Sequence, residues 1–281
     1  MLSYLRWESA SMADAHANIL QAERVSRSAD PDERSQALAH AARCLVLLER
    51  NLGQAEAFLL EARGVSERSG ASAAVASALG MISAHRGERA LADAALTEAQ
   101  DLARASGERL AEFGALEHRV MLALDLGTGH AEGLAASLVE LAARVRPGAE
   151  AVIARSLHAL AQVLESDAED GLLRAALADL RMADARYELS FALTRRATHA
   201  LAKGSLETAT EAASDGLEVS RAVGRCSENR HRDGRFGGGC SAAWRPADGR
   251  PTPTQPRRHG RVRHSATARR WLRQLDAPGP T

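Results

Sequence analysis

The sequence predicts an all-α protein built from antiparallel helix pairs, and three observations support this prediction. Hydrophobic residues make up 45% of the 281 residues but aromatic residues only 3%, so the core must consist mainly of Ala, Leu and Val. Ala and Leu are strong helix formers, and small side chains let helices pack closely. Apolar residues also recur with helical spacing in successive segments, and short turns that contain glycine separate these segments. The length allows one or two domains with a sizeable core.

Residues 1–29 predict one helix that lacks a preceding partner. Ala13, Ala17 and Leu20 lie three or four residues apart, as expected for the buried face of the second helix of a pair. Asp30 then precedes a proline, which is a typical start of a new helix. We therefore expect an orphan helix of an incomplete repeat in this region.

Residues 30–224 predict about five helix pairs, each with one anchor residue in its turn. The anchors are Gly53, Gly87, Gly129, Ala168 and Gly204. They lie 34, 42, 39 and 36 residues apart, so the turns recur at a loose but regular period. The pairs are separated by the dipeptides Ser69-Gly70, Ser106-Gly107 and Pro147-Gly148.

The residues around each anchor follow a common pattern. The positions eight and seven before it, and five, nine and twelve after it, are small or apolar in every pair except at Arg196. For the anchor Gly87 they are Leu79, Gly80, Ala92, Leu96 and Ala99. The three later positions share one helical face, and the glycine at position 80 predicts a close approach of the two helices. A helical bundle without a repeat is the alternative interpretation.

The spacings of 34 to 42 residues lie near the period of tetratricopeptide repeats, about 34 residues, but are looser, and the Leu79-Gly80 pair also resembles these repeats. The predicted fold is therefore a tetratricopeptide-like α-solenoid of antiparallel helix hairpins, followed by a disordered C-terminal tail. Residues 42–63, 85–122 and 183–197 are also similar to the helical-repeat region of bacterial LuxR-type regulators and of adenylate/guanylate cyclases with an AAA-like ATPase.

The resemblance to these signalling proteins implies a neighbouring ATPase module, and in some regulators a helix-turn-helix. The sequence contains no G-x-x-x-x-G-K-[ST] loop and no recognisable cyclase or DNA-binding segment. We therefore expect a fragment of a multidomain ATP-binding signalling or transcriptional regulator. In this fragment the repeats form a non-catalytic scaffold for protein interaction.

The formal charge of zero conceals two opposite regions. Residues 1–224 contain 32 acidic and 23 basic residues, whereas residues 225–281 contain 4 acidic and 13 basic residues. The helical region is therefore acidic, with a balance of −9, and predicts a basic protein or peptide partner on the concave face of the solenoid.

Residues 225–281 are rich in Arg, Gly and Pro and hold six of the eight prolines. Such a composition does not support a repeating helix, so a disordered tail is expected. One interpretation is out-of-frame translation of a GC-rich gene. Another is a basic segment that binds nucleic acid, which makes a nucleic-acid-binding regulator the alternative function. A small folded module is the third.

Two groups of Cys and His residues are candidates for metal sites. Cys226, His231, Cys240, His259 and His264 resemble a metal-ligand set only superficially, because the cysteines are too far apart for a zinc finger. The other group contains His40, His85, His118, His158 and His199, one per pair. These histidines lie at different offsets from their anchors, so they predict no ladder of ligands.

The remaining reactive side chains have simple structural interpretations. Cys44 lies on an apolar helix face and is expected to be a buried small hydrophobe. Asp167, Glu169 and Asp170 lie in a turn and are expected to cap the next helix. The sequence therefore predicts no catalytic, cofactor-binding or metal-ligating residue, no cofactor and no enzyme activity.

The cellular location follows from what the sequence lacks. The first residues contain no signal-peptide-like apolar run, and no stretch approaches the roughly 18 apolar residues of a membrane span. The three cysteines are too few and too scattered for a disulfide framework. Lys203 is the only lysine, and this bias suggests a GC-rich bacterial gene. We expect a cytoplasmic protein without membrane contact.

Overall fold

The structure, a computed structural model, describes residues 12–48, 51–69, 72–145, 148–166 and 170–223. All regular secondary structure within these residues is helical, so the all-α prediction is confirmed for this part of the chain. The helices are α2 (Met12–Ser26), α3 (Pro31–Leu47), α4 (Leu52–Ser69), α5 (Ala73–Arg86), α6 (Arg89–Ser106), α7 (Arg109–Leu126), α8 (Ala131–Ala142), α9 (Glu150–Glu165), α10 (Asp170–Met182), α11 (Arg186–Ala202) and α12 (Leu206–Val223). The segment 225–281, predicted to be disordered or out of frame, lies outside the described residues.

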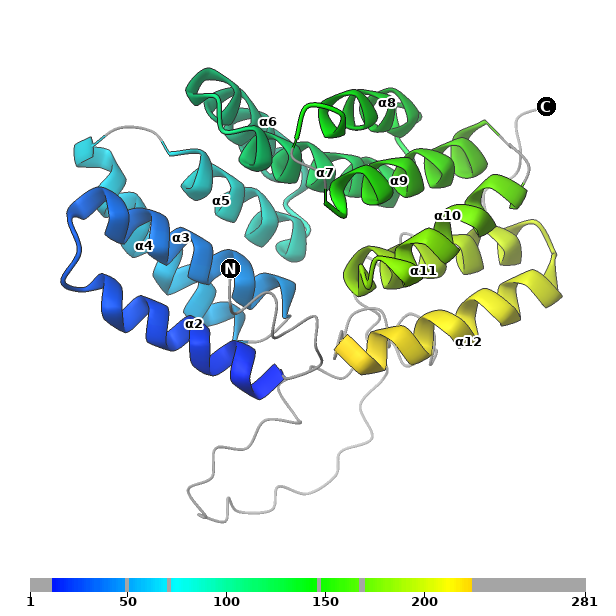
Figure 1. The fold of residues 1–281 in the computed structure, drawn as a ribbon, viewed down its shortest axis with the longest axis horizontal. Helices are drawn as coiled ribbons and strands as arrows, with labels where there is room; N and C mark the ends of the chain where they lie inside the picture. The colour runs from blue at the N-terminus through cyan, green and yellow to red at the C-terminus, as the bar shows by residue number, and fades with distance from the viewer. Residues whose placement is uncertain (1–11, 49–50, 70–71, 146–147, 167–169, 224–281) are drawn as a thin grey trace, which may run out of the picture.

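Each helix packs against the next one along the chain. The most extensive contacts join α3 to α4, α5 to α6, and α11 to α12. Figure 1 shows the helices following one another around an arch, with α2 and α12 at its two ends. Helix α2 packs on α3 and lies in the region where the sequence predicts one helix.

The start of α3 follows directly from its sequence. The Asp30 carboxylate accepts hydrogen bonds from the backbone N–H groups of Asp32 at 2.9 Å and Glu33 at 3.0 Å. These N–H groups have no partner within the helix, so the cap satisfies two of them. Pro31, the first helical residue, has no N–H to satisfy.

Two turns on either side of α6 use glycine in the left-handed region. Gly87 and Gly107 end α5 and α6 with φ values of 77° and 76°. The N–H of the residue after each glycine bonds back to a carbonyl five residues earlier, at 2.9 Å for Glu88 and 2.8 Å for Glu108. A residue with a Cβ would be strained in this conformation, which explains why glycine stands there.

The close approach predicted at Gly80 is present. A Cβ on Gly80 would lie 2.6 Å from Cγ of Leu96 and 3.2 Å from the carbonyl oxygen of Ala92. Both of these residues belong to the face of α6 that the sequence pattern predicted to be buried. Glycine at this position therefore lets α5 and α6 pack against each other more tightly than alanine would.

The core is continuous from Ile19 in α2 to Leu193 in α11. Apart from Phe191, its largest fully buried side chains are all Leu or Ile, as the low aromatic content predicts. The predicted positions around the fourth anchor are all buried, and they are Leu160, Ala161, Leu173, Leu177 and Leu180. The anchor itself, Ala168, lies outside the described residues.

Arg196, the exception in the apolar pattern, is also buried. It is 5% exposed, and its Nε donates a hydrogen bond of 2.8 Å to the carboxylate of Asp170 in α10. A second N–H of its guanidinium bonds the other oxygen of the same carboxylate. The position is therefore occupied by an ion pair that joins α10 to α11.

In the described part of the chain, no helix is both long enough and apolar enough to cross a bilayer.

Candidate functional site

A groove of about 480 Å³ lies between the first helices of the arch. Its walls come from α3, α5, α7 and the end of α6, and we call it the α3–α7 groove. The residues that line it are Asp32, Ser35, Gln36, His40, Arg43, Ser72, Ala73, Ala74, Ser77, Leu102, Ala105, Ser106, Glu108 and Ala111.

The two long sides of the α3–α7 groove differ in chemistry. The α3 side carries polar side chains at positions 32, 36, 40 and 43, whose spacing of four, four and three places them on one helical face. The opposite side contains small residues, among them Ala73, Ala74, Ala105 and Ala111. Because these side chains are short, they leave the space that forms the groove.

One end of the α3–α7 groove is acidic. Asp32 lies in the first turn of α3, and Glu108 precedes α7 as its N-cap residue without capping it through the side chain. Both side chains are exposed, and neither forms an ion pair with any residue that the structure describes. Ser72, the N-cap residue of α5, lines the same groove and also makes no side-chain cap bond.

Ser77 contributes an unsatisfied polar atom to the α3–α7 groove. The residue is 4% exposed, and its hydroxyl has no hydrogen-bond partner among the described residues. A buried hydroxyl without a partner costs free energy that a bound polar group would recover. By contrast, the Ser35 hydroxyl on the α3 side donates a hydrogen bond of 3.0 Å to the carbonyl of Ala62.

A pair of buried carboxyl groups lies deeper in the arch. Glu117 in α7 and Glu188 in α11 are 8% and 4% exposed, and the two carboxyl groups act on each other electrostatically. Burial, and then the negative charge of Glu188, raise the pKa of Glu117 well above its ordinary value, while Arg43 acts in the opposite direction. This arrangement favours one shared proton between the two groups, and it connects helices that are not adjacent in the chain.

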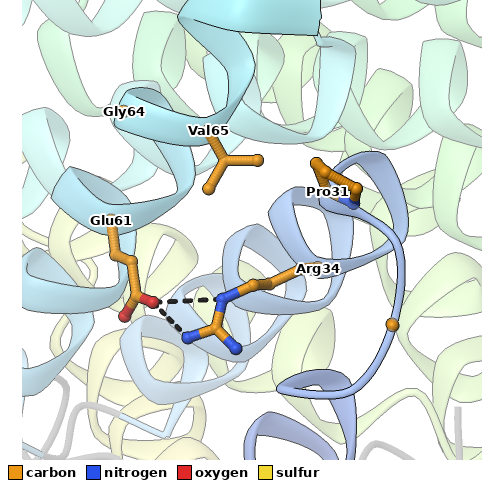
Figure 2. Close-up of a pocket in the computed structure, with 6 residues that line it drawn as sticks. Pro31, Arg34, Glu61, Gly64 and Val65 are labelled. Atoms are coloured by element: carbon orange, nitrogen blue, oxygen red, sulfur yellow. Dashed lines mark hydrogen bonds and ion pairs between the residues drawn. The ribbon is translucent and has the colours of Figure 1, made fainter.

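A second, shallower pocket lies where α2 turns into α3. Figure 2 shows Arg34 reaching across it to Glu61 on α4, with Pro31, Gly64 and Val65 around them. The Nε of Arg34 donates a hydrogen bond of 3.1 Å to the Glu61 carboxylate. Since the two charged groups satisfy each other, this pocket has the character of a structural contact between α3 and α4.

The five repeat histidines all fall on first helices of the pairs, one each on α3, α5, α7, α9 and α11. Their surroundings differ. His40 and His85 are exposed, whereas a ring nitrogen of His118 lies 2.8 Å from the carbonyl of Gly114 within its own helix. Within the described ranges, no three His, Cys, Asp or Glu side chains are arranged to hold a metal ion. The Cys and His residues of the tail lie outside those ranges.

Two other candidates have structural surroundings. Cys44 is half-buried against the core, and burial raises the pKa of its thiol, which disfavours the reactive thiolate. Asp170 begins α10, and its carboxylate binds Arg196 on the next helix. The expected capping residues Asp167 and Glu169 lie outside the described part of the chain.

The sequence predicted neither the α3–α7 groove nor the Glu117–Glu188 pair. The spacing of Asp32, Gln36, His40 and Arg43 was a signal for a polar helix face, because none of these residues falls on an apolar position of the repeat pattern. The two glutamates carry no such local signal, since each is an ordinary charged residue in a charged helix. Only the fold brings them together.

Comparisons with known proteins identify no relative. No family model matches this chain, and neither does any curated protein or solved structure. The functional argument therefore depends on the geometry of the described residues.

Proposed function

We propose that residues 30–224 form a tetratricopeptide-like α-solenoid that acts as a non-catalytic scaffold for protein interaction or regulation. The order of packing supports this proposal, because contacts are most extensive between helices that follow one another along the chain. The regular spacing of the turns and the buried pattern around them agree with a repeat.

The partner that this scaffold fits is a basic, peptide-like segment. The observation that carries this choice is the α3–α7 groove, where the carboxylates of Asp32 and Glu108 form no ion pair with the described residues. The net charge of −9 over residues 1–224 also attracts a basic partner, and it does so over a longer range.

The resemblance to bacterial regulators and cyclases supports a wider context for this scaffold. We place it in the cytoplasm, as a region of a multidomain ATP-binding signalling or transcriptional regulator. In such a protein the repeats would receive a partner, and other modules would supply nucleotide chemistry.

The experiment is a binding screen of the full chain against an array of short peptides matched in length. One third of the array is basic, one third is neutral and one third is acidic. We expect preferential binding to basic peptides that weakens as salt increases, because exposed charges are screened. Equal binding to all three classes, or none, would contradict the proposal.

The alternative is a nucleic-acid-binding regulator that acts through residues 225–281. The observation in its favour is the 13 Arg residues against 4 acidic residues in that segment. Fluorescence anisotropy with a DNA duplex tests it. Salt-dependent binding that a chain ending at residue 224 loses would support the alternative, and negligible binding by the full chain would refute it.

A further inference from the structure

The α3–α7 groove has the length of a short extended peptide. Asp32 and Arg43 both line it and lie eleven residues apart on α3. At 1.5 Å per residue the groove therefore runs for about 16 Å along this helix. An extended chain advances about 3.3 Å per residue, so about five peptide residues fit along it.

Helices α3, α5 and α7 begin at one end of the groove, and the charges at this end favour a cation. The N-termini of α3, α5 and α7 each contribute about half a positive charge at most, or about 1.5 in total. Asp32 and Glu108 together contribute two negative charges at this end of the groove. The carboxylates therefore outweigh the helix dipoles, and an anion would be repelled.

The floor of the groove offers a hydrogen-bonding group to a ligand. The Ser77 hydroxyl lines the groove, is buried, and has no partner in the described part of the chain. A peptide backbone supplies both a donor and an acceptor at every residue. It can therefore satisfy this hydroxyl whichever role the hydroxyl takes.

From these observations we infer that the α3–α7 groove is the peptide-binding site of the scaffold. It takes an extended segment of about five residues. The segment places an arginine or lysine side chain at the carboxylates of Asp32 and Glu108 and its backbone at Ser77. This inference rests on the proposed function and adds the length of the bound segment, the place of its basic side chain and the contact of its backbone with Ser77.

The test is an NMR titration of the ¹⁵N-labelled full chain with a defined probe. The probe is an acetylated and amidated pentapeptide with one arginine in an alanine–serine background. The matched peptide has citrulline, which is neutral and nearly isosteric, in place of arginine. We expect the arginine peptide to shift amide signals around the groove, and the citrulline peptide to bind about tenfold more weakly or not at all.

Two kinds of variant locate the binding. The double variant Asp32→Asn/Glu108→Gln removes the two groove carboxylates, and we expect it to weaken binding of the arginine peptide about tenfold. Its control is Glu33→Gln/Glu98→Gln, which changes the net charge equally at exposed positions outside the groove. We expect the control to bind as the unmodified chain does.

A steric variant tests the groove without changing charge. Ala105 is exposed and lines the groove, so Ala105→Trp fills part of it and is expected to abolish binding. Ala90→Trp places the same side chain at an exposed position of the same helix, away from the groove, and should leave binding unchanged. Circular dichroism confirms that each variant is folded.

The outcomes separate the two proposals. Basic peptides that bind the full chain equally well with and without the groove substitutions would overturn the groove and leave the scaffold proposal standing. Failure of every basic peptide to bind would overturn the scaffold proposal itself. A chain that ends at residue 224 could also bind the probe tenfold or more tightly than the full chain. That result would show that the Arg-rich segment 225–281 occupies the groove, and the inference of a separate partner would be wrong.

Discussion

In the region from α10 to α12, guanidinium groups reach carboxylates on neighbouring helices, whereas in the α3–α7 groove two exposed carboxylates form no ion pair with the described residues. Arg196 binds Asp170, and Arg181 binds Asp215 on α12. Around the groove, Asp32 and Glu108 make no such pair within the described residues. The difference indicates that charges of the first region hold helices together, while those of the groove are available to a ligand.

The core beneath the two regions does not explain this difference. A single cluster of Ala, Leu and other apolar side chains runs through both. The distinction instead lies in side-chain size. Near Arg196 long side chains pair across helices, whereas short residues such as Ala73 and Ala74 line the groove.

The largest effect on stability is expected for Arg196→Ala. This change removes a buried side chain and its bonds to Asp170, so we expect the free energy of unfolding to fall by about 2–4 kcal/mol. Urea denaturation measures it. Arg155→Ala is the control, because Arg155 and Asp179 are both more than half exposed and lie 3.8 Å apart. It should cost no more than about 0.5 kcal/mol. Equal losses for the two variants would show that the buried pair has no special structural role.

A smaller loss is expected where α5 and α6 approach each other. The added methyl of Gly80→Ala meets Leu96 at 2.6 Å, so we expect a net destabilisation of about 1–2 kcal/mol. In α4, a Cβ on Gly64 meets nothing within 4 Å. Gly64→Ala should therefore stabilise the protein by about 0.5–1 kcal/mol through helix propensity. Thermal unfolding of both variants compares them, and a stabilising Gly80→Ala would contradict the close contact.

The Glu117–Glu188 pair predicts a dependence of stability on pH. The pKa of Glu117 is raised in the folded state, so the folded protein binds more protons than the unfolded chain above the ordinary glutamate value of 4.5. The stabilisation is complete below that value and is lost as pH rises through the folded pKa.

Glu117→Gln keeps the shape of the neutral acid and removes this titration. Besides Glu188, the charged groups that act on Glu117 are Arg43 and Glu150. We expect the variant to match the unmodified chain near pH 4 and to exceed it in stability at pH 8, as measured by urea denaturation. Glu98→Gln, at an exposed position, should leave the pH profile unchanged. An identical profile for the two variants would argue against the shared proton.

The smallest effect on stability is expected in the groove. Asp32→Asn and Glu108→Gln remove exposed carboxylates without ion-pair partners among the described residues, so each should change the free energy of unfolding by less than about 1 kcal/mol. Thermal unfolding provides the measurement. A larger loss would show that these carboxylates serve the fold and are not available for a ligand.

Local signals were sufficient to predict where helices begin and end. Asp30 and Pro31 start α3, and Gly87 and Gly107 end α5 and α6, because capping and left-handed backbone depend on neighbouring residues. The tight contact at Gly80 was also predictable, since a glycine stands at one of the small or apolar positions of the pattern around the anchor.

The candidate site was not predictable in this way, because it depends on contacts between distant segments. Asp32 and Glu108 line one groove although 76 positions separate them in the sequence. Glu117 and Glu188 interact although 71 positions separate them, and nothing nearby in the sequence distinguishes them from exposed glutamates. Outside the candidate site, Arg196 gave a visible signal, since a charged residue at an apolar position requires a partner when it is buried.

The most direct test of the contrast between the two regions is a map of amide shifts when the single-arginine peptide is added to the full chain. The account predicts that the largest shifts lie in residues 32–43, 72–77 and 105–111, and that residues 170–221 change little. Shifts concentrated on the paired charges of α10 to α12, with none around Asp32, Ser77 and Glu108, would contradict it.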